Sequence, residues 1–160
     1  MQHKRALTIA IITPLGCAIG GNALTGAAVT TWYPTLKKSR VILPLWAFVP
    51  IGIAYYLMCG VLLYRLLALI TPHRARTEAI ALLFSVMGAN EAWNYLFFGR
   101  KDLRASLFGL IGFVVLTLVL YRALKRIDQR SATILRPYLG WLGYDLVWAE
   151  ELWRLNHEAR

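Results

Sequence analysis

The sequence predicts an all-α integral membrane protein, folded as one bundle of five transmembrane helices over residues 1–160. Its composition is 58% hydrophobic and only 16% charged, which is too apolar for a soluble domain of this length. A membrane span needs about 20 mostly apolar residues, so five spans and their loops account for the whole chain. No stretch remains for a separate soluble catalytic or nucleic-acid-binding module.

The net charge of +10 comes mostly from Lys and Arg in the loops and at the ends of the apolar runs. Such residues anchor a membrane protein to anionic headgroups, so we expect the lipid bilayer as partner and no nucleic acid. Cys17 and Cys59 lie inside apolar runs, which indicates small buried side chains rather than a disulfide or a metal site.

The first expected span covers residues 6–29. Gly16 and Gly20 have the spacing that lets another helix approach closely, and the alternative is that they make room for a ligand. Close packing needs no ligand, so we favour it. A long loop at residues 30–45 follows, and it is either a lid over a binding site or an interfacial belt of aromatic and basic anchors.

The remaining expected spans cover residues 46–68, 78–98, 103–124 and 132–155. Pro50 falls in a first helical turn, where the missing N–H has no partner to lose. One of Tyr55 and Tyr56 is expected to face inward, and Thr77 is expected to cap the third span. The fourth span is plainly apolar and should face lipid over much of its surface.

The stretch at residues 88–98 ends the third span with a mixture that lipid does not favour. Asn90, Glu91 and Asn94 cannot face hydrocarbon at low cost, so they should face other helices or a cavity. Helical spacing places Asn90, Asn94 and Phe97 on one face, and Glu91 with Phe98 on the next. We interpret this segment as the wall of an internal site.

Motifs on three segments resemble one known family. The loop has Trp-Tyr-x-x-Leu-x-Lys, the third span has Asn-x-x-Trp-x-x-x-Phe-Phe, and the fifth has Pro-Tyr-x-x-Trp followed by Trp-x-Leu-Asn. The residues are Trp32, Tyr33, Leu36, Lys38, Asn90, Trp93, Phe97, Phe98, Pro137, Tyr138, Trp141, Trp153, Leu155 and Asn156. Their order and placement are similar to those of the TspO/MBR family, the tryptophan-rich sensory proteins that include the mitochondrial translocator protein.

The resemblance implies a receptor or carrier for porphyrins such as protoporphyrin IX and haem, or for sterol-like ligands, with no required cofactor. It also implies a homodimer, and we favour the bacterial cell membrane over the mitochondrial outer membrane. The chain departs from the family pattern at several pocket positions, among them Val86, Asp145 and Trp148. This looks like a divergent member whose pocket has been rebuilt.

Glu91 and Asp145 should lie at similar depth, because both follow the start of parallel spans by thirteen residues. An ionised carboxylate at that depth costs several kcal/mol unless it is paired. One explanation is pairing with Lys37, Lys38 or Arg40, or with the amides of Asn90 and Asn94. The others are a pocket for a cationic or hydroxylated ligand, and a carboxylate pair that holds a proton or a metal.

The sequence therefore predicts a membrane receptor or carrier for a hydrophobic aromatic ligand, tetrapyrrole or sterol-like. Two alternatives stay open: a non-catalytic subunit of a larger membrane complex, and a porphyrin-degrading enzyme, which ranks last because no catalytic constellation is visible. The expected ligand-binding residues are Trp32, Tyr33, Lys38, Asn90, Glu91, Trp93, Asn94, Phe97, Phe98, Tyr138, Trp141, Asp145 and Trp148. No catalytic residue and no metal ligand is assigned.

Overall fold

The computed structural model describes residues 2–39, 43–70 and 73–157, which contain helices and no strand. The long helices are α1 (Gln2–Thr25), α3 (Phe48–Tyr64), α4 (Arg74–Asn94), α5 (Leu103–Ile127) and α6 (Gln129–Asn156). π-Helical turns extend α3 and α4, as η3 (Arg65–Leu69) and η4 (Tyr95–Gly99). The shorter elements are α2 (Ala28–Thr31) and the 3₁₀ turns η1 (Tyr33–Thr35) and η2 (Leu45–Ala47).

The all-α class is confirmed, and the described residues contain six α-helices rather than five because the loop forms the four-residue helix α2. The first span was expected to reach residue 29, but α1 ends at Thr25. Gly26 follows with a φ of 51°, a left-handed conformation that glycine adopts at little cost and that ends a helix.

Thr77 does not cap the third span, so that prediction is wrong. α4 begins one turn earlier, at Arg74, after the extended residue His73. Glu78 lies in the second turn and pairs with Arg74 across one helical turn, at 3.0 Å. Pro50 does occupy the first turn of α3, as expected.

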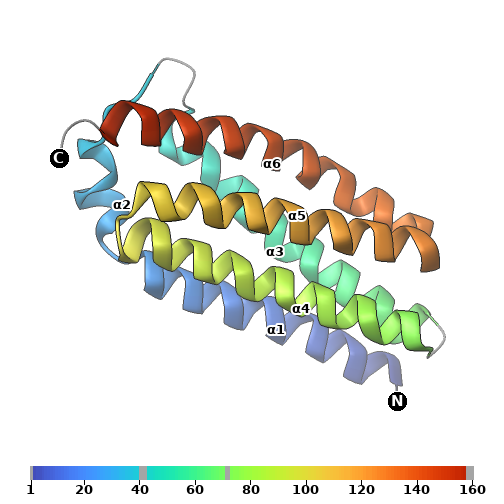
Figure 1. Ribbon diagram of the computed structural model, residues 1–160. Helices are drawn as coiled ribbons and strands as arrows, with labels where there is room; N and C mark the ends of the chain where they lie inside the picture. Colours follow the sequence, from blue (N-terminus) through green and yellow to red (C-terminus); the bar gives the residue numbers. More distant parts are fainter. Residues whose placement is uncertain (1, 40–42, 71–72, 158–160) are drawn as a thin grey trace.

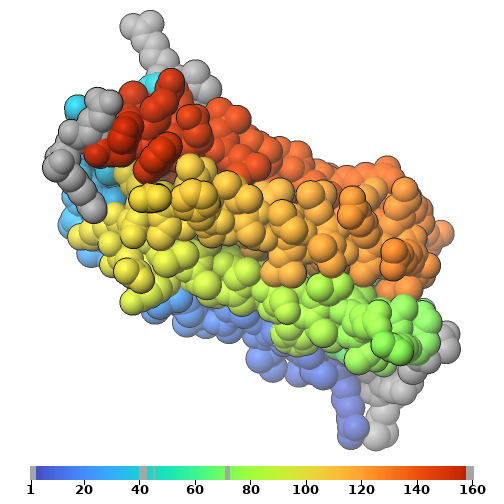
Figure 2. Space-filling model, in the orientation of Figure 1, coloured from blue at the N-terminus to red at the C-terminus, as the bar shows by residue number. Residues whose placement is uncertain are grey.

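The five long helices lie side by side in an elongated bundle, with α4, α5 and α6 in front of α1 and α3 (Figure 1). α1 contacts α3 and α4, α5 contacts α4 and α6, and α3 and α6 close the ring. The loop before α3, the α4–α5 turn and the end of α6 therefore meet at one end of the bundle. The space-filling view shows α4, α5 and α6 packed against one another along their length (Figure 2).

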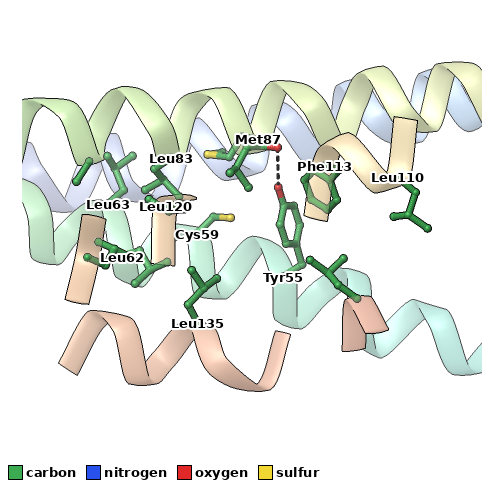
Figure 3. Packing of buried hydrophobic residues seen from close by; sticks show 14 of the residues in the cluster. Tyr55, Cys59, Leu62, Leu63, Leu83, Met87, Leu110, Phe113, Leu120 and Leu135 are labelled. Atoms are coloured by element: carbon green, nitrogen blue, oxygen red, sulfur yellow. Dashed lines mark hydrogen bonds between the residues drawn. The ribbon is translucent and has the colours of Figure 1, made fainter. Parts of the chain in front are cut away.

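The core forms because each long helix buries one stripe of side chains. On α5 the buried positions are Ser106, Leu110, Phe113, Thr117, Leu120 and Leu124, which recur every three or four residues. α3 contributes Tyr55, Cys59, Leu62 and Leu63, and Figure 3 shows them against residues of α4, α5 and α6. The hydroxyl of Tyr55 donates to the carbonyl of Val86 at 3.4 Å, so this buried phenol is satisfied.

The glycines that let helices approach are not the expected ones. A Cβ added to Gly16 or Gly20 would meet no neighbour, so the close-packing interpretation of that pair is wrong within this chain. The contact between α1 and α3 lies at Gly60, where a Cβ would come within 2.8 Å of the carbonyl oxygen of Ala10. Pro14 has no N–H to bond to that carbonyl, so α3 approaches α1 where α1 lacks an internal hydrogen bond.

The outer face of the bundle carries many large apolar side chains. Ile12 on α1, Leu57 on α3 and Phe108 on α5 are each about 60% exposed or more. Within the described residues, three helical segments are long and apolar enough to cross a membrane: His3–Thr25, Phe48–Leu69 and Leu103–Ile127. The expectation that the fourth span faces lipid agrees with the exposed apolar side of α5.

An ion pair fixes the opposite end of the bundle. The guanidinium of Arg65 on η3 donates to Asp128, in the joint between α5 and α6, at 2.7 and 3.0 Å. Ser131 donates to the same carboxylate oxygen at 2.6 Å. Burial would raise the pKa of Asp128, but the hydrogen bonds from Ser131 and Arg65 outweigh it and lower the pKa below its ordinary value.

Candidate functional site

An aromatic cluster fills the end of the bundle where the loop lies. Phe97 on η4 is its centre, with ring centroids 5.1 Å from Trp148 on α6, 5.2 Å from Trp93 on α4 and 5.3 Å from Trp32 in the loop. Tyr33 lies 6.3 Å from Phe97 and 6.4 Å from Trp148. Loop, η4 and α6 thus bring together rings that are far apart in the sequence.

The cluster contains two buried polar atoms that have no hydrogen-bond partner of normal geometry within the described residues. Tyr33 is 3% exposed and Trp148 is 4% exposed. The hydroxyl of Tyr33 and the indole N–H of Trp148 are neighbours, but neither makes a well-formed hydrogen bond within the described residues. Burial raises the pKa of the Tyr33 phenol, so it stays a hydroxyl that can donate. Buried polar groups are normally bonded, so this pair is exceptional.

Other predicted site residues surround this centre. Phe98 packs edge-on against Phe97, with centroids 4.7 Å apart. Trp93 also donates its indole N–H to the carbonyl of Ser106 at 3.1 Å, which ties α4 to α5. Its polar edge is therefore already used.

The sequence analysis missed Phe48, at the start of α3. Its ring lies 5.3 Å from Trp148 and 5.4 Å from Trp141, so it connects Trp141 to the cluster. Tyr138 lies deeper, with its ring 4.9 Å from Tyr55. No sequence motif marks Phe48, and the available signal is only its place at the end of the bundle that holds the loop.

Glu91, Asn90 and Asn94 form a second group, directed toward α1 and α3. Tyr56 donates to one oxygen of Glu91 at 2.7 Å, Asn90 donates to the same oxygen at 3.1 Å, and Asn94 donates to the other at 3.3 Å. A side chain at Gly21 on α1 would overlap the carboxylate. Both Tyr55 and Tyr56 thus face inward, rather than one of them.

The carboxylates of Glu91 and Asp145 have different neighbours. The neighbours of Glu91 are the hydroxyl and amides just given, so the amide part of the pairing explanation agrees with the structure. Asp145 lies beside the indole of Trp141, one turn earlier on α6. Within the described part of the chain, no group of three or more His, Cys, Asp or Glu side chains gathers as a metal site would.

The loop lies along α6 and is fastened to it. Lys37 exchanges two backbone hydrogen bonds with the side chain of Asn156, at 2.9 and 3.0 Å. Ser39 donates to Glu151, and the N–H of Leu43 donates to Tyr144 at 2.9 Å. The loop therefore covers the aromatic cluster with Trp32 and Tyr33.

Lys38, one of the expected ligand-binding residues, bonds to the backbone of its own loop. Its ammonium donates to the carbonyls of Tyr33, Pro34 and Leu36 and lies 4.5 Å above the ring of Tyr33. These bonds hold the turn η1 together, and they do not pair Lys38 with Glu91. Lys37, a second expected partner, forms no ion pair within the described residues, and Arg40, the third, lies outside them.

Comparisons with known proteins agree with this architecture. The family model of the TspO/MBR family matches residues 10–154. The tryptophan-rich protein TspO of Archaeoglobus fulgidus is 30% identical over 140 residues, 85% of this chain and 87% of the relative. The human translocator protein is 27% identical over 161 aligned positions, which cover 97% of this chain and 92% of the relative. The protein CrtK of Rhodobacter capsulatus is 26% identical over 156 residues, which cover 94% of this chain and 94% of the relative.

The match covers most of the chain and agrees with the motifs on the loop, α4 and α6. Together with the apolar helices, it confirms the prediction of an integral membrane protein that crosses the bilayer more than once. The chain belongs to the TspO/MBR family.

Proposed function

We propose that this protein is a membrane receptor or carrier that binds a hydrophobic aromatic ligand in the cluster around Phe97 and Trp148. The observation that carries the proposal is the pair of buried polar atoms on Tyr33 and Trp148, enclosed by aromatic rings. Binding sites for small molecules are mostly apolar, with a few convergent polar groups that orient the ligand. A ligand acceptor placed between these donors would satisfy both.

The proposed ligand class is a tetrapyrrole, with sterol-like molecules second. Flat aromatic ligands suit a site of Trp, Tyr and Phe rings, which prefer stacked and edge-on contacts. The names of the relatives, tryptophan-rich protein and translocator protein, describe those proteins and specify no ligand for this one. The rings of the cluster touch one another, so a ligand has to move the loop residues Trp32 and Tyr33 aside to enter.

The proposed membrane arrangement has five crossings. α4 has 21 residues and is extended by the five-residue turn η4, and α6 has 28 residues. At about 1.5 Å per residue, both exceed the roughly 30 Å of the hydrocarbon core. Each lies between apolar neighbours in the ring of helices, so its polar side chains can face the interior.

The test is a titration of the detergent-purified protein with protoporphyrin IX, followed by tryptophan fluorescence and the Soret band. Wild-type protein should show saturable binding. Tyr33→Phe keeps the ring and removes one buried donor, so it should weaken binding by about tenfold, the factor that corresponds to 1.4 kcal/mol. Tyr64→Phe makes the same change at the opposite end of the bundle, where Tyr64 lies beside His3, and should leave binding unchanged. Equal binding by all three proteins would contradict the role of Tyr33.

A further inference from the structure

A cavity lies at the loop end of the bundle, beside the aromatic cluster, and shares Trp32 with it. Its volume is about 360 Å³, within the lower part of the roughly 300–1,000 Å³ range of small-molecule sites. Three segments form it: the loop, the α4–α5 turn and the end of α6. The lining residues that matter here are Trp32, Lys101, Asp102, Arg104, Trp153 and Asn156.

The charge of this cavity is positive. Lys101 and Arg104 have no carboxylate partner among the ion pairs of the described residues. The one acid in the lining, Asp102, already serves as the N-cap of α5, because its carboxylate accepts the N–H of Ala105 at 2.9 Å. Two cations are therefore available to an incoming anion.

The backbone at Lys101 is held in an unusual conformation. Its φ of 55° lies in the left-handed region, and Lys101 is the one non-glycine residue there in the described chain. Such a conformation is strained for a residue with a Cβ. The hydrogen bond from the N–H of Asp102 to the carbonyl of Leu96, at 3.2 Å, closes the turn and holds Lys101 at the rim of the cavity.

The other walls are held by contacts that do not use the cations. The side chain of Asn156 bonds to both backbone groups of Lys37 and fixes the loop against α6. The ring of Trp153 stacks on His157, with centroids 5.1 Å apart, and Trp32 packs edge-on against Phe97. The cavity thus combines two indoles with two cations.

We infer that this cavity binds an anionic amphiphile, with its carboxylate or phosphate between Lys101 and Arg104 and its apolar part against Trp32 and Trp153. A guanidinium and an ammonium make strong charge-assisted hydrogen bonds to such oxyanions. The indoles supply the apolar surface that a free inorganic ion would not use. The same chemistry is offered by a lipid headgroup and by a free acid such as a fatty acid. The site shares Trp32 with the aromatic cluster, but its two cations and Trp153 lie outside that cluster, so the site is filled without a tetrapyrrole.

The experiment uses 2-bromohexadecanoate, because the bromine beside its carboxylate quenches only indoles near the headgroup. The detergent-purified protein should be quenched saturably by this acid and not by its methyl ester. Lys101→Gln combined with Arg104→Gln should weaken the affinity by about tenfold. The matched control is Lys125→Gln with Arg126→Gln, two exposed cations at the other end of α5, and it should bind as wild type does.

Two outcomes would overturn the inference: equal quenching by the acid and its ester, or equal weakening in both double variants. The thermal unfolding temperature of each variant, measured alongside, separates loss of the site from loss of the fold. Reconstitution in phosphatidylcholine with and without phosphatidylglycerol then identifies the source. If phosphatidylglycerol competes with the bromo acid, the occupant is a lipid headgroup. If phosphatidylglycerol does not compete, the occupant is a free acid.

Discussion

The hydroxyl of Tyr56 on α3 donates to the carboxylate of Glu91 on α4 at 2.7 Å, beside a glycine of α1. Three neutral donors bind this carboxylate: the phenol and the amides of Asn90 and Asn94. The group joins three helices at a depth where each unsatisfied polar atom is costly. It is therefore a structural contact of this chain that needs no ligand.

Gly21→Ala should disrupt this junction. The new Cβ would overlap the carboxylate of Glu91, so we expect the free energy of unfolding to fall by about 1–3 kcal/mol, as at other overpacked sites. The same substitution at Gly20, inside α1 where a Cβ meets no neighbour, should stabilise the protein by about 0.5–1 kcal/mol, because alanine favours the helix over glycine. Thermal unfolding in detergent measures both. Equal effects of the two substitutions would show that Gly21 is not a contact point.

Tyr56→Phe should remove one donor from Glu91 and destabilise the protein by about 1.5–3 kcal/mol, the range for hydrogen bonds to charged groups. In a Glu91→Gln background the acceptor is uncharged, so the same substitution should cost less. A double-mutant cycle by thermal unfolding measures the coupling. If the two effects simply add, the phenol and the carboxylate do not interact.

The ion pair between Arg65 and Asp128 should make the stability of the fold depend on pH. The lowered pKa of Asp128 means that its contribution is complete above the ordinary carboxyl pKa of about 3.9 and is lost as the pH falls through the lower folded value. Asp128→Asn should therefore unfold at a lower temperature at neutral pH, and the difference should shrink in acid. Unfolding temperatures measured from pH 7 downward give both curves.

The matched control for the Arg65–Asp128 ion pair is Glu78→Gln. Glu78 pairs with Arg74 on the exposed surface of α4, where an ion pair contributes about 0–1 kcal/mol. Its unfolding curve should stay near that of the wild type at every pH. A pH dependence as steep in Asp128→Asn as in the wild type would assign the acid sensitivity to other carboxylates.

Much of the fold could be predicted from the sequence, because long apolar runs and polar turns set the lengths and order of the helices. The ends were less predictable: Thr77 has the chemistry of a cap, but α4 starts at Arg74. Which side chains contact another helix depends on how the helices are arranged around one another, and a single sequence does not reveal that arrangement. For that reason the spacing in the sequence indicates Gly16 and Gly20, whereas the close contacts in the structure lie at Gly21 and Gly60.

The candidate site is likewise predictable only in part from the sequence. The motif residues Trp32 and Phe97 do come together in one cluster, and Trp148, where the chain departs from the family pattern, lies between the same elements. Phe48 completes it from α3 but belongs to no motif, and Lys38 belongs to a motif but serves the loop. The assignment of these residues to a ligand stays a prediction.

The most direct test of the proposed function is the affinity for protoporphyrin IX of two phenylalanine variants, read from the Soret band. Phe97→Ala removes the ring at the centre of the cluster, and Phe108→Ala removes a ring that is 61% exposed on the outer side of α5. Our account predicts saturable binding by wild type and Phe108→Ala, and binding weakened at least about tenfold in Phe97→Ala. Tyr33→Phe separates loss of binding from loss of packing. No saturable binding by the wild type, or equal affinity of both alanine variants, would contradict a ligand site in this cluster.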